Sequence, residues 1–462
     1  MRLKSKVLEI PGGNIFENDK LKRKESIKNL SLLLRNVSSP LVLSVNAPWG
    51  AGKTTYLKML HEDLKTNDGK SIYFSAWETD FAVDPLLAFL GEMNFAISSY
   101  YSGDSKKNRA WKKAKEAGAH ILRRGIPVGV KLATAGLIDA EKLIEDEAGK
   151  FTEALSKDVI SSYSKNKEAI TVFKKSVKEV LKNSEGDTEK LFIFVDELDR
   201  CRPTYAIELL ERIKHLLDIE GLVFILALDK SQLAHSVNAV YGSEFDAAGY
   251  LKRFIDIEFS LPSAELDTYI NHLFVSFDLD AYFAGRKGRD TAFDKENLIR
   301  VLNIVCGGMS LRSIEQLLTR IKLVSLTVPN NNYFYPEYTV FLLRVKDLYP
   351  AVYSNFCRKD FDGEEMLGVI SKVLHGGEDI IWAKQYIQAL IISSKMQGAR
   401  PWVDQKINDL KAAAGSELAN ESVRRNASGI LEFISDANRM GNSVSLVSII
   451  NRIEMLSDFK FE

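Results

Sequence analysis

One short segment, residues 46–55, constrains this chain more than any other. Its sequence NAPWGAGKTT fits the pattern GxxxxGK[ST] at every position but the first, where Ala47 replaces glycine. The apolar run 41–45 precedes the segment, and apolar side chains recur at helical spacing after it. A strand, a glycine-rich loop and a helix in this order surround an anion with backbone N–H groups and a helix N-terminus. The segment therefore predicts a phosphate-binding loop.

The residue types within this loop predict ATP and Mg²⁺ as ligands. Gly50 and Gly52 let the backbone turn its N–H groups inward, Lys53 reaches the β and γ oxygens, and Thr54 supplies a hydroxyl to Mg²⁺. Alanine at the first position matters only if that position requires a positive φ. The residues expected to hold the nucleotide are Ala47, Trp49, Gly50, Ala51, Gly52, Lys53, Thr54 and Thr55.

A second apolar run, residues 191–195, ends in two carboxylates, Asp196 and Glu197. Asp196 is expected to hold the hydration shell of Mg²⁺. Glu197 is expected to polarise the attacking water as the catalytic base, because phosphoryl transfer depends on positioning and electrostatics. Asp199 is the next candidate for the base if Glu197 does not act.

Further apolar segments predict the rest of an α/β fold. Strands are expected at 71–77, 222–228 and 254–261, with amphipathic helices such as 85–99 and 205–217 between them. Continuous apolar strands that alternate with helices indicate a parallel sheet covered on both faces.

The same pattern divides the chain into domains. Residues 1–99 and 190–262 are predicted to form the core, with a helical insertion at 100–189 where strand patterns disappear. No strand pattern follows Pro262, so we expect a helical lid at 263–330 and an all-α C-terminal domain at 331–462.

Three polar residues outside the loop and the acidic pair are candidates for contact with the γ-phosphate. Asp229 follows the strand 222–228 and either senses the γ-phosphate or caps the next helix. Arg253 precedes the last strand and Arg312 opens a later helix, and either guanidinium suits a phosphate.

Composition sets the remaining expectations. Lysine plus arginine equals aspartate plus glutamate at 62 each, so any contact with nucleic acid or membrane requires a local patch. Cys201, Cys306 and Cys357 form no CxxC motif, and the histidines form no cluster, which favours a reducing cytoplasm and no metal site built from protein ligands alone. No signal peptide is expected in 1–13, and no apolar run reaches the roughly 20 residues of a membrane helix.

At this point the sequence resembles the KAP family of P-loop NTPases, a branch of the additional-strand, catalytic-glutamate class that is related to AAA+ and STAND proteins. The resemblance covers about residues 15–322. Five motifs carry it: W-G-x-G-K-T at 49–54, F-x-A-W at 74–77, D-[DE]-L-D-R-C at 196–201, Y-L-x-[KR] at 250–253 before Leu261-Pro262, and S-L-R at 310–312.

This resemblance implies a sheet order of 5-1-4-3-2, ATP as substrate, and oligomers with sites at subunit contacts. For bacterial members without membrane helices it also implies roles in antiphage defence beside an effector protein, often from the same operon. Glu197 replaces the aspartate often found in the family, which favours a catalytic base. Many relatives carry two membrane helices in the insertion, but here residues 126–138 are too few and include Lys131.

Three functions remain open. The first is an oligomeric ATPase switch that gates a partner through the helical tail, with Arg253 reaching a neighbouring subunit or Arg312 taking that role. The second is a nucleic-acid-binding ATPase motor, because residues 105–124 carry eight Lys or Arg, in a run that begins at Lys106 and ends at Arg124, against one acid. A solvated helix face explains the same run. The third, a small-molecule kinase, is disfavoured by Glu197, which suits attack by water.

Overall fold

A computed structural model describes residues 14–17, 19–82, 84–122, 159–262, 265–286, 293–330, 332–333, 335–358, 363–374, 376, 380–395, 400–439 and 445–458. The described residues up to 262 belong to one compact unit and those from 265 onwards to a second. Residues 1–13, where no signal peptide is expected, and residues 126–138, where no membrane span is expected, lie outside the described residues.

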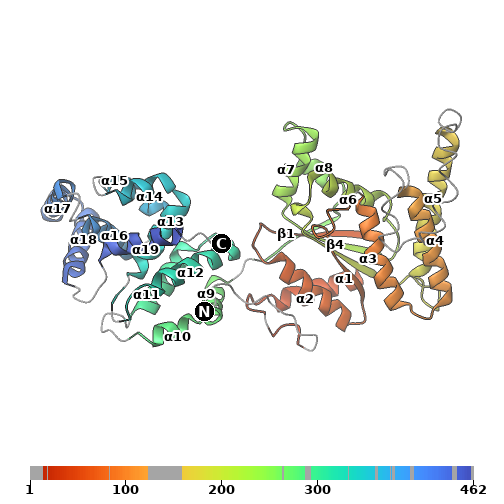
Figure 1. Cartoon of the computed structure of the whole chain (residues 1–462), viewed down its shortest axis with the longest axis horizontal. Coiled ribbons are helices and arrows are strands. Elements are labelled where there is room, and N and C mark those ends of the chain that lie inside the picture. The colour runs from red at the N-terminus through yellow and green to blue at the C-terminus, as the bar shows by residue number, and fades with distance from the viewer. Residues whose placement is uncertain are drawn as a thin grey trace. The chain divides into compact units, whose positions relative to one another are not determined.

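The first unit is built on a sheet of five parallel strands in the order β2-β3-β4-β1-β5. Figure 1 labels two of its neighbouring strands, β1 and β4. Taken from the other edge, this is the order 5-1-4-3-2, so the prediction is confirmed. The strands are β1 (Leu41–Asn46), β2 (Lys70–Ser75), β3 (Leu191–Asp196), β4 (Leu222–Leu228) and β5 (Ile257–Ser260).

Two predicted strand boundaries are wrong. β5 begins at Ile257 rather than at residue 254, because the backbone N–H of Phe254 donates to the carbonyl of Leu251 in a turn that closes the preceding helix. β2 ends at Ser75 rather than at Trp77, since the chain enters consecutive turns at residue 76. Phe254 is buried beside the helix before β5, whereas Trp77 is exposed and its ring lies against the guanidinium of Arg200.

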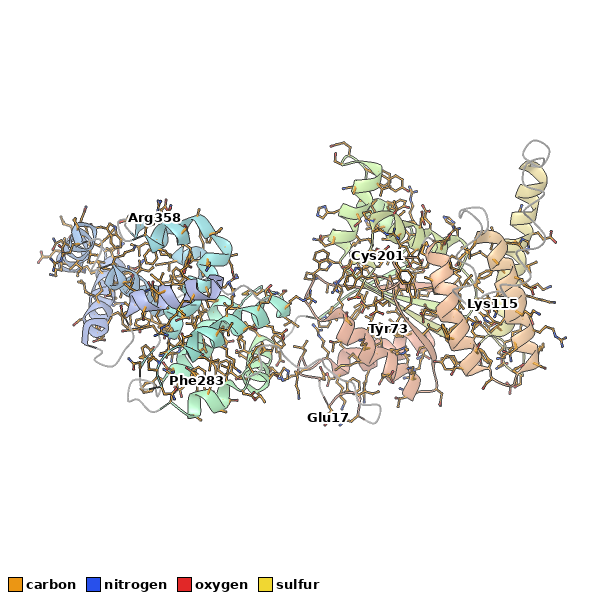
Figure 2. The ribbon with its side chains drawn as sticks, in the orientation of Figure 1. Glu17, Tyr73, Lys115, Cys201, Phe283 and Arg358 are labelled. Atoms are coloured by element: carbon orange, nitrogen blue, oxygen red, sulfur yellow. The ribbon has the colours of Figure 1, made fainter. Side chains whose placement is uncertain are left out.

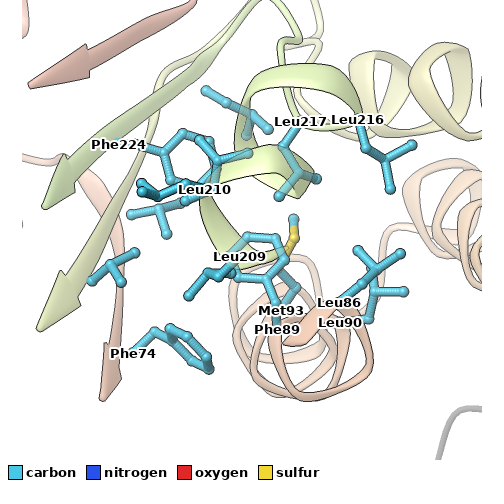
Figure 3. Close-up of a cluster of buried hydrophobic side chains, with 14 of the residues drawn as sticks. Phe74, Leu86, Phe89, Leu90, Met93, Leu209, Leu210, Leu216, Leu217 and Phe224 are labelled. Carbon is cyan, nitrogen blue, oxygen red and sulfur yellow. The ribbon is translucent and has the colours of Figure 1, made fainter. Parts of the chain in front are cut away.

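Helices cover both faces of this sheet, and their apolar side chains explain why. On one face Phe74 and Phe224 of the strands pack against Phe89, Met93 and Leu210 of two helices (Figure 3). Burying each such side chain contributes roughly 1.5–3 kcal/mol. The helices of this layered core are α1 (Lys24–Asn36), α2 (Lys53–Thr66), α3 (Pro85–Tyr100), α6 (Pro203–His215), α7 (Lys230–Tyr241) and α8 (Ala247–Leu251).

Between α3 and β3 the chain forms a pair of long helices, α4 (Ser105–Leu122) and α5 (Val159–Val180). They lie side by side, and α4 also packs on α3 (Figure 1). Trp111 and Phe173 are buried between them and the core. The described part of the predicted insertion is therefore a helical hairpin on the flank of the sheet.

The second unit is helical. Leu317, Tyr338 and Phe341 are fully buried in its larger apolar cluster, and a smaller cluster includes Ile392 and Ile430. Within the described residues, no helix combines the length and the apolar content needed to cross a membrane. The helices of this unit are α9 (Leu266–Ser276), α10 (Leu279–Ala284), α11 (Asp294–Val305), α12 (Leu311–Leu326), α13 (Pro336–Leu348), α14 (Pro350–Cys357), α15 (Glu364–Val373), α16 (Ile381–Ser394), α17 (Arg400–Gly415), α18 (Glu421–Arg439) and α19 (Leu446–Asp458).

Candidate nucleotide-binding site

The glycine-rich loop connects the end of β1 to the start of α2 and owes its shape to two glycines. Gly50 has φ 79° and Gly52 has φ 84°, a left-handed conformation that side chains with a Cβ rarely adopt. Among the described residues, Ala47 is not one of the non-glycine positions with positive φ. Alanine therefore replaces the first glycine of the pattern without backbone strain.

Lys53, the first residue of α2, is buried against this loop. Its Nζ donates to the carbonyl oxygens of Ala47 at 2.6 Å and Pro48 at 3.3 Å, and lies 3.7 Å from Oδ2 of Asp199. Burial lowers the pKa of Lys53, and the Asp199 carboxylate opposes that shift. The ammonium is thus held in the loop by acceptors from both sides.

Asp199 has a larger part in the loop than the sequence indicated. Its Oδ2 accepts from the indole Nε1 of Trp49 at 2.6 Å and from the backbone N of Asp229 at 2.9 Å, in addition to the pair with Lys53. Oδ2 of Asp199 therefore connects three elements: the loop through Trp49, α2 through Lys53, and the residue after β4 through Asp229. With three donors around Oδ2, Asp199 is better placed to position the loop than to take a proton from water.

Asp196 is the buried last residue of β3, next to the candidate base. Its Oδ1 accepts from the backbone N of Glu197 at 2.9 Å, and its Oδ2 accepts from the hydroxyl of Tyr73 at 2.5 Å. Burial and the Asp196 charge raise the pKa of Tyr73 far above its usual value, so the phenol keeps its proton and donates. Tyr73 is on β2, the edge strand beside β3, where Figure 2 labels it.

Glu197 leaves the strand in a left-handed conformation, with φ 62° and ψ 26°, and begins a short 3-10 turn (Leu198–Arg200). Its Oε1 pairs with Nη1 of Arg200 at 2.5 Å, and its Oε2 accepts from the hydroxyl of Ser75 at 3.3 Å. The guanidinium of Arg200 also lies over the ring of Trp77, 5.8 Å from its centroid. Both oxygens of the candidate base are therefore engaged by side chains of the protein.

Asp229 caps α7 and also contacts the loop. Its Oδ1 accepts from the backbone N of Ser231 at 3.1 Å and of Gln232 at 3.3 Å, as a helix N-cap does. Its Oδ2 accepts from the backbone N of Trp49 at 3.2 Å. The cap alternative is the observed geometry, and contact with a γ-phosphate stays a prediction.

Of the two candidate arginines, Arg253 lies away from this group of residues, and Arg312 belongs to the second unit. Arg253 is exposed and precedes β5, so it lies towards the amino ends of the strands, whereas the loop and the acidic pair follow their carboxyl ends. Arg312 is exposed in the first turn of α12 in the second unit. Ala47–Thr55 together with Asp196, Glu197 and Asp229 therefore share one edge of the sheet, and Arg253 does not.

Sequence reasoning missed Arg23, the buried residue before α1. Its Nη2 donates to the carbonyls of Ala51 at 3.0 Å and Pro262 at 3.1 Å, and its Nη1 lies 3.5 Å from the carbonyl of Gly52. Arg23 thus joins the loop to the end of the sheet's last segment. No spacing pattern points to it, because its partners are backbone atoms distant in sequence.

The residues present fit a nucleotide with its metal. Gly52 caps α2 without a side-chain hydrogen bond, so the N–H groups of the first turn are available to a phosphate. Thr54 and Asp196 offer the hydroxyl and carboxylate oxygens that Mg²⁺ prefers. Across the described residues, no group of three or more His, Cys, Asp or Glu side chains could hold a metal by itself, so phosphate oxygens would have to complete such a site.

Comparison with known proteins adds a family. Residues 23–328 match the model of the KAP family P-loop domain. No curated protein matches the chain. Among solved structures, the Cdc6 protein of Pyrobaculum aerophilum aligns over 97% of this chain and 95% of that chain, at 13% identity and a TM-score of 0.35. The ORC1 protein of Aeropyrum pernix in complex with DNA aligns over 94% and 92%, at 12% identity and a TM-score of 0.32. Scores this low say nothing about what the present chain binds.

Proposed function

The chain belongs to the KAP family of P-loop NTPases. From this premise we propose that it binds ATP with Mg²⁺ at residues 47–55 and hydrolyses the bond between the β- and γ-phosphates. One observation carries the proposal. The glycine loop and Lys53 follow the carboxyl end of β1, and Asp196 and Glu197 lie at the carboxyl end of β3. In the parallel sheet β4 lies between these two strands, so both groups are on the same edge. In open α/β sheets, ligands bind at this edge.

Each residue has a part in the proposed reaction. The loop N–H groups and Lys53 bind the phosphates, and Thr54 and Asp196 hold the metal, which neutralises charge on the β and γ oxygens when bound. Glu197 accepts a proton from the attacking water. It must first release Arg200, which holds Oε1 at 2.5 Å. Asp199 keeps Trp49 and Lys53 in place.

Binding is tested by Lys53→Ala, which removes the main point charge opposite the β- and γ-phosphates. Titration calorimetry with ATP and Mg²⁺ should show loss of binding, whereas Lys65→Ala, an exposed position on the same helix, should bind as the wild type does. Micromolar affinity retained in the Lys53 variant would mean that residues 47–55 are not the site.

Hydrolysis is tested by Glu197→Gln, which preserves shape but removes the base. We expect ATP and Mg²⁺ to remain bound while phosphate release slows by on the order of a hundredfold or more. Unchanged turnover with intact binding would assign the base elsewhere, and Asp199→Asn would be the next variant to measure.

We further propose that the active form is an oligomer in which Arg253 completes the site of a neighbouring subunit. Arg253 is exposed and distant from its own loop, and a guanidinium near the γ-phosphate stabilises the transition state. Mixing Arg253→Ala subunits with Glu197→Gln subunits, each inactive alone, should restore part of the turnover. If mixed oligomers form without activity, or if the wild type is fully active as a monomer at any dilution, Arg253 has no such role and Arg312 becomes the candidate.

The proposed output is a switch that gates a partner or effector protein through the helical second unit, in antiphage defence within the cytoplasm. The family resemblance supports this step, and the three cysteines, free in the structure, are in keeping with a reducing compartment. The genes adjacent to this one test it. An effector gene within a defence operon would support the switch, and a housekeeping context would remove it.

A further inference from the structure

The hairpin of α4 and α5 concentrates positive charge that the whole chain lacks. The chain balances 62 basic against 62 acidic residues. On α4, Lys106, Arg109 and Lys113 recur at positions i, i+3 and i+7 and therefore form one stripe. This stripe and Lys175 of α5 line a groove of about 370 Å³ between the two helices. The lysines that the sequence showed on α4 thus act together with a residue of α5 that the sequence did not indicate.

These four cations are exposed, and few acidic side chains lie near them. Among the described residues, none forms an ion pair with Lys106, Arg109, Lys113 or Lys175, although the described part of the chain holds many such pairs. Glu179 is the one acid that lines the groove, and Lys182 already pairs with it at 2.7 Å. The hydrogen bond from Lys182, with further help from Lys106 and Lys175, lowers the pKa of Glu179. The groove is therefore open and strongly positive.

The spacing of the stripe matches a phosphate backbone. At a helical rise of 1.5 Å per residue, Lys106 and Lys113 are separated by roughly 10 Å along α4. Along the axis of a duplex each strand advances about 3.4 Å per phosphate, so a stripe laid along that axis spans about three phosphates. A single small anion would leave most of these cations without a partner.

The other side chains of the hairpin favour a duplex over a single strand or a membrane. Trp111 and Phe173 are buried, at 3% and 0% exposed, so neither can stack on an unpaired base or insert into lipid. Among the hairpin side chains that the structure describes, the large apolar ones that are exposed are the aliphatic Ile170 and Val172 of α5. What the groove offers to a partner is charge, and that suits contact with the backbone of a duplex.

We propose that the α4–α5 groove binds the phosphate backbone of double-stranded nucleic acid, without reading its sequence. The contact is electrostatic and lies outside the nucleotide site, so it does not depend on ATP hydrolysis. Each lysine or arginine that neutralises a phosphate releases a condensed counterion, which makes the affinity fall with salt.

Fluorescence anisotropy with the full chain and a labelled 20-base-pair DNA of arbitrary sequence tests the proposal, over about 50 to 200 mM salt. Four contacts predict a slope of log K against log salt of about −3 to −4. The double variant Arg109→Gln/Lys113→Gln should weaken binding at least tenfold and reduce the slope by about 2. Lys175→Gln, on the other helix, should reduce the slope by about 1.

The matched control is Lys28→Gln/Lys252→Gln, two exposed lysines outside the hairpin, which should bind as the wild type does. Circular dichroism establishes that each variant is folded. Equal losses in the control and in the groove variant would overturn the proposal, as would tighter binding to the single strand than to the duplex. Binding to phosphatidylserine vesicles without binding to the duplex would also overturn it and assign the groove to a membrane.

Discussion

Replacing Arg200 with glutamine should raise the rate of ATP hydrolysis, because Arg200 restrains the proposed base. Oε1 of Glu197 lies 2.5 Å from Nη1 of Arg200, and a carboxylate held in this way is a poorer acceptor for a proton from water. The hydroxyl of Ser75 restrains Oε2 less, at 3.3 Å. Removing the guanidinium frees one oxygen and leaves the backbone of the turn unchanged.

The size of the increase follows from the exposure of the pair. The side chain of Arg200 is 30% exposed and that of Glu197 is 18% exposed, so water screens much of the attraction. Ion pairs of this kind contribute about 0.5 to 1 kcal/mol. Since 1.36 kcal/mol corresponds to a tenfold change in rate, the increase is about two- to fivefold. Ser75→Ala should give an increase of less than about twofold, because its hydrogen bond is longer.

The assay is steady-state phosphate release at saturating ATP and Mg²⁺. Arg202→Gln is the matched control, because this neighbouring arginine binds Asp80 rather than Glu197. The increase must also disappear in a Glu197→Gln background, where no base remains to be freed. A lower rate in Arg200→Gln would refute the reasoning and show that the arginine assists the reaction. The same increase in the Glu197→Gln background would show that it acts through another group.

Three further predictions concern the stability of the ligand-free chain, measured by urea denaturation. Burial lowers the pKa of His61 to about 4, so an unfolded chain takes up its proton first as the pH falls, and stability is lost between pH 6.5 and 4. At pH 5 the wild type should have lost about 2 kcal/mol of its free energy of unfolding through His61, and His61→Phe should not show this loss. The exposed control His235→Phe should lose as much as the wild type. Burial raises the pKa of Glu337 to about 7, which has the opposite sign: stability present below pH 4.5 is lost as the pH rises through 7. Glu337→Gln should therefore stabilise the second unit at pH 8 by up to about 3 kcal/mol, and an equal effect at pH 4 would contradict this cause. Trp49→Phe removes the indole donor to Asp199 and should cost about 1 to 2 kcal/mol. This is more than for Trp77→Phe, because a phenyl ring at residue 77 can keep the contact with the guanidinium of Arg200.

The parts of the fold that sequence predicts well are those with a local cause. The apolar run 222–228 is the strand β4 with the same bounds, because continuous burial requires continuous apolar residues. The predicted start of β5 at residue 254 was wrong because Phe254 is buried for a different reason. It packs beside α8, the short helix before the strand. An apolar pattern records burial and does not say which element is buried.

The candidate site follows the same rule. Lys53 and Thr54 come from a motif whose residues are adjacent in sequence, and Asp196 and Glu197 from a strand end. Arg200 lies only three positions after Glu197, yet the sequence does not predict their ion pair. The pair depends on a short 3-10 turn that brings the two side chains together. Tyr73 reaches Asp196 from another strand, so its part depends on the pairing of β2 with β3. Contacts of this kind become visible only when the sheet order is known.

The loop itself shows how a binding shape can persist without the first glycine of its motif. Arg23 holds the carbonyls of Ala51 and Gly52, and Lys53 holds that of Ala47. In a peptide unit the N–H points away from the C=O, so cations that bind the carbonyls turn the N–H groups towards the open side of the loop. Lys53 has three protons to donate and can keep the Ala47 carbonyl while it binds a phosphate oxygen. The glycines supply the two left-handed positions, and the buried cations fix the orientation of the peptides between them, so an alanine at residue 47 is compatible with the proposed anion site.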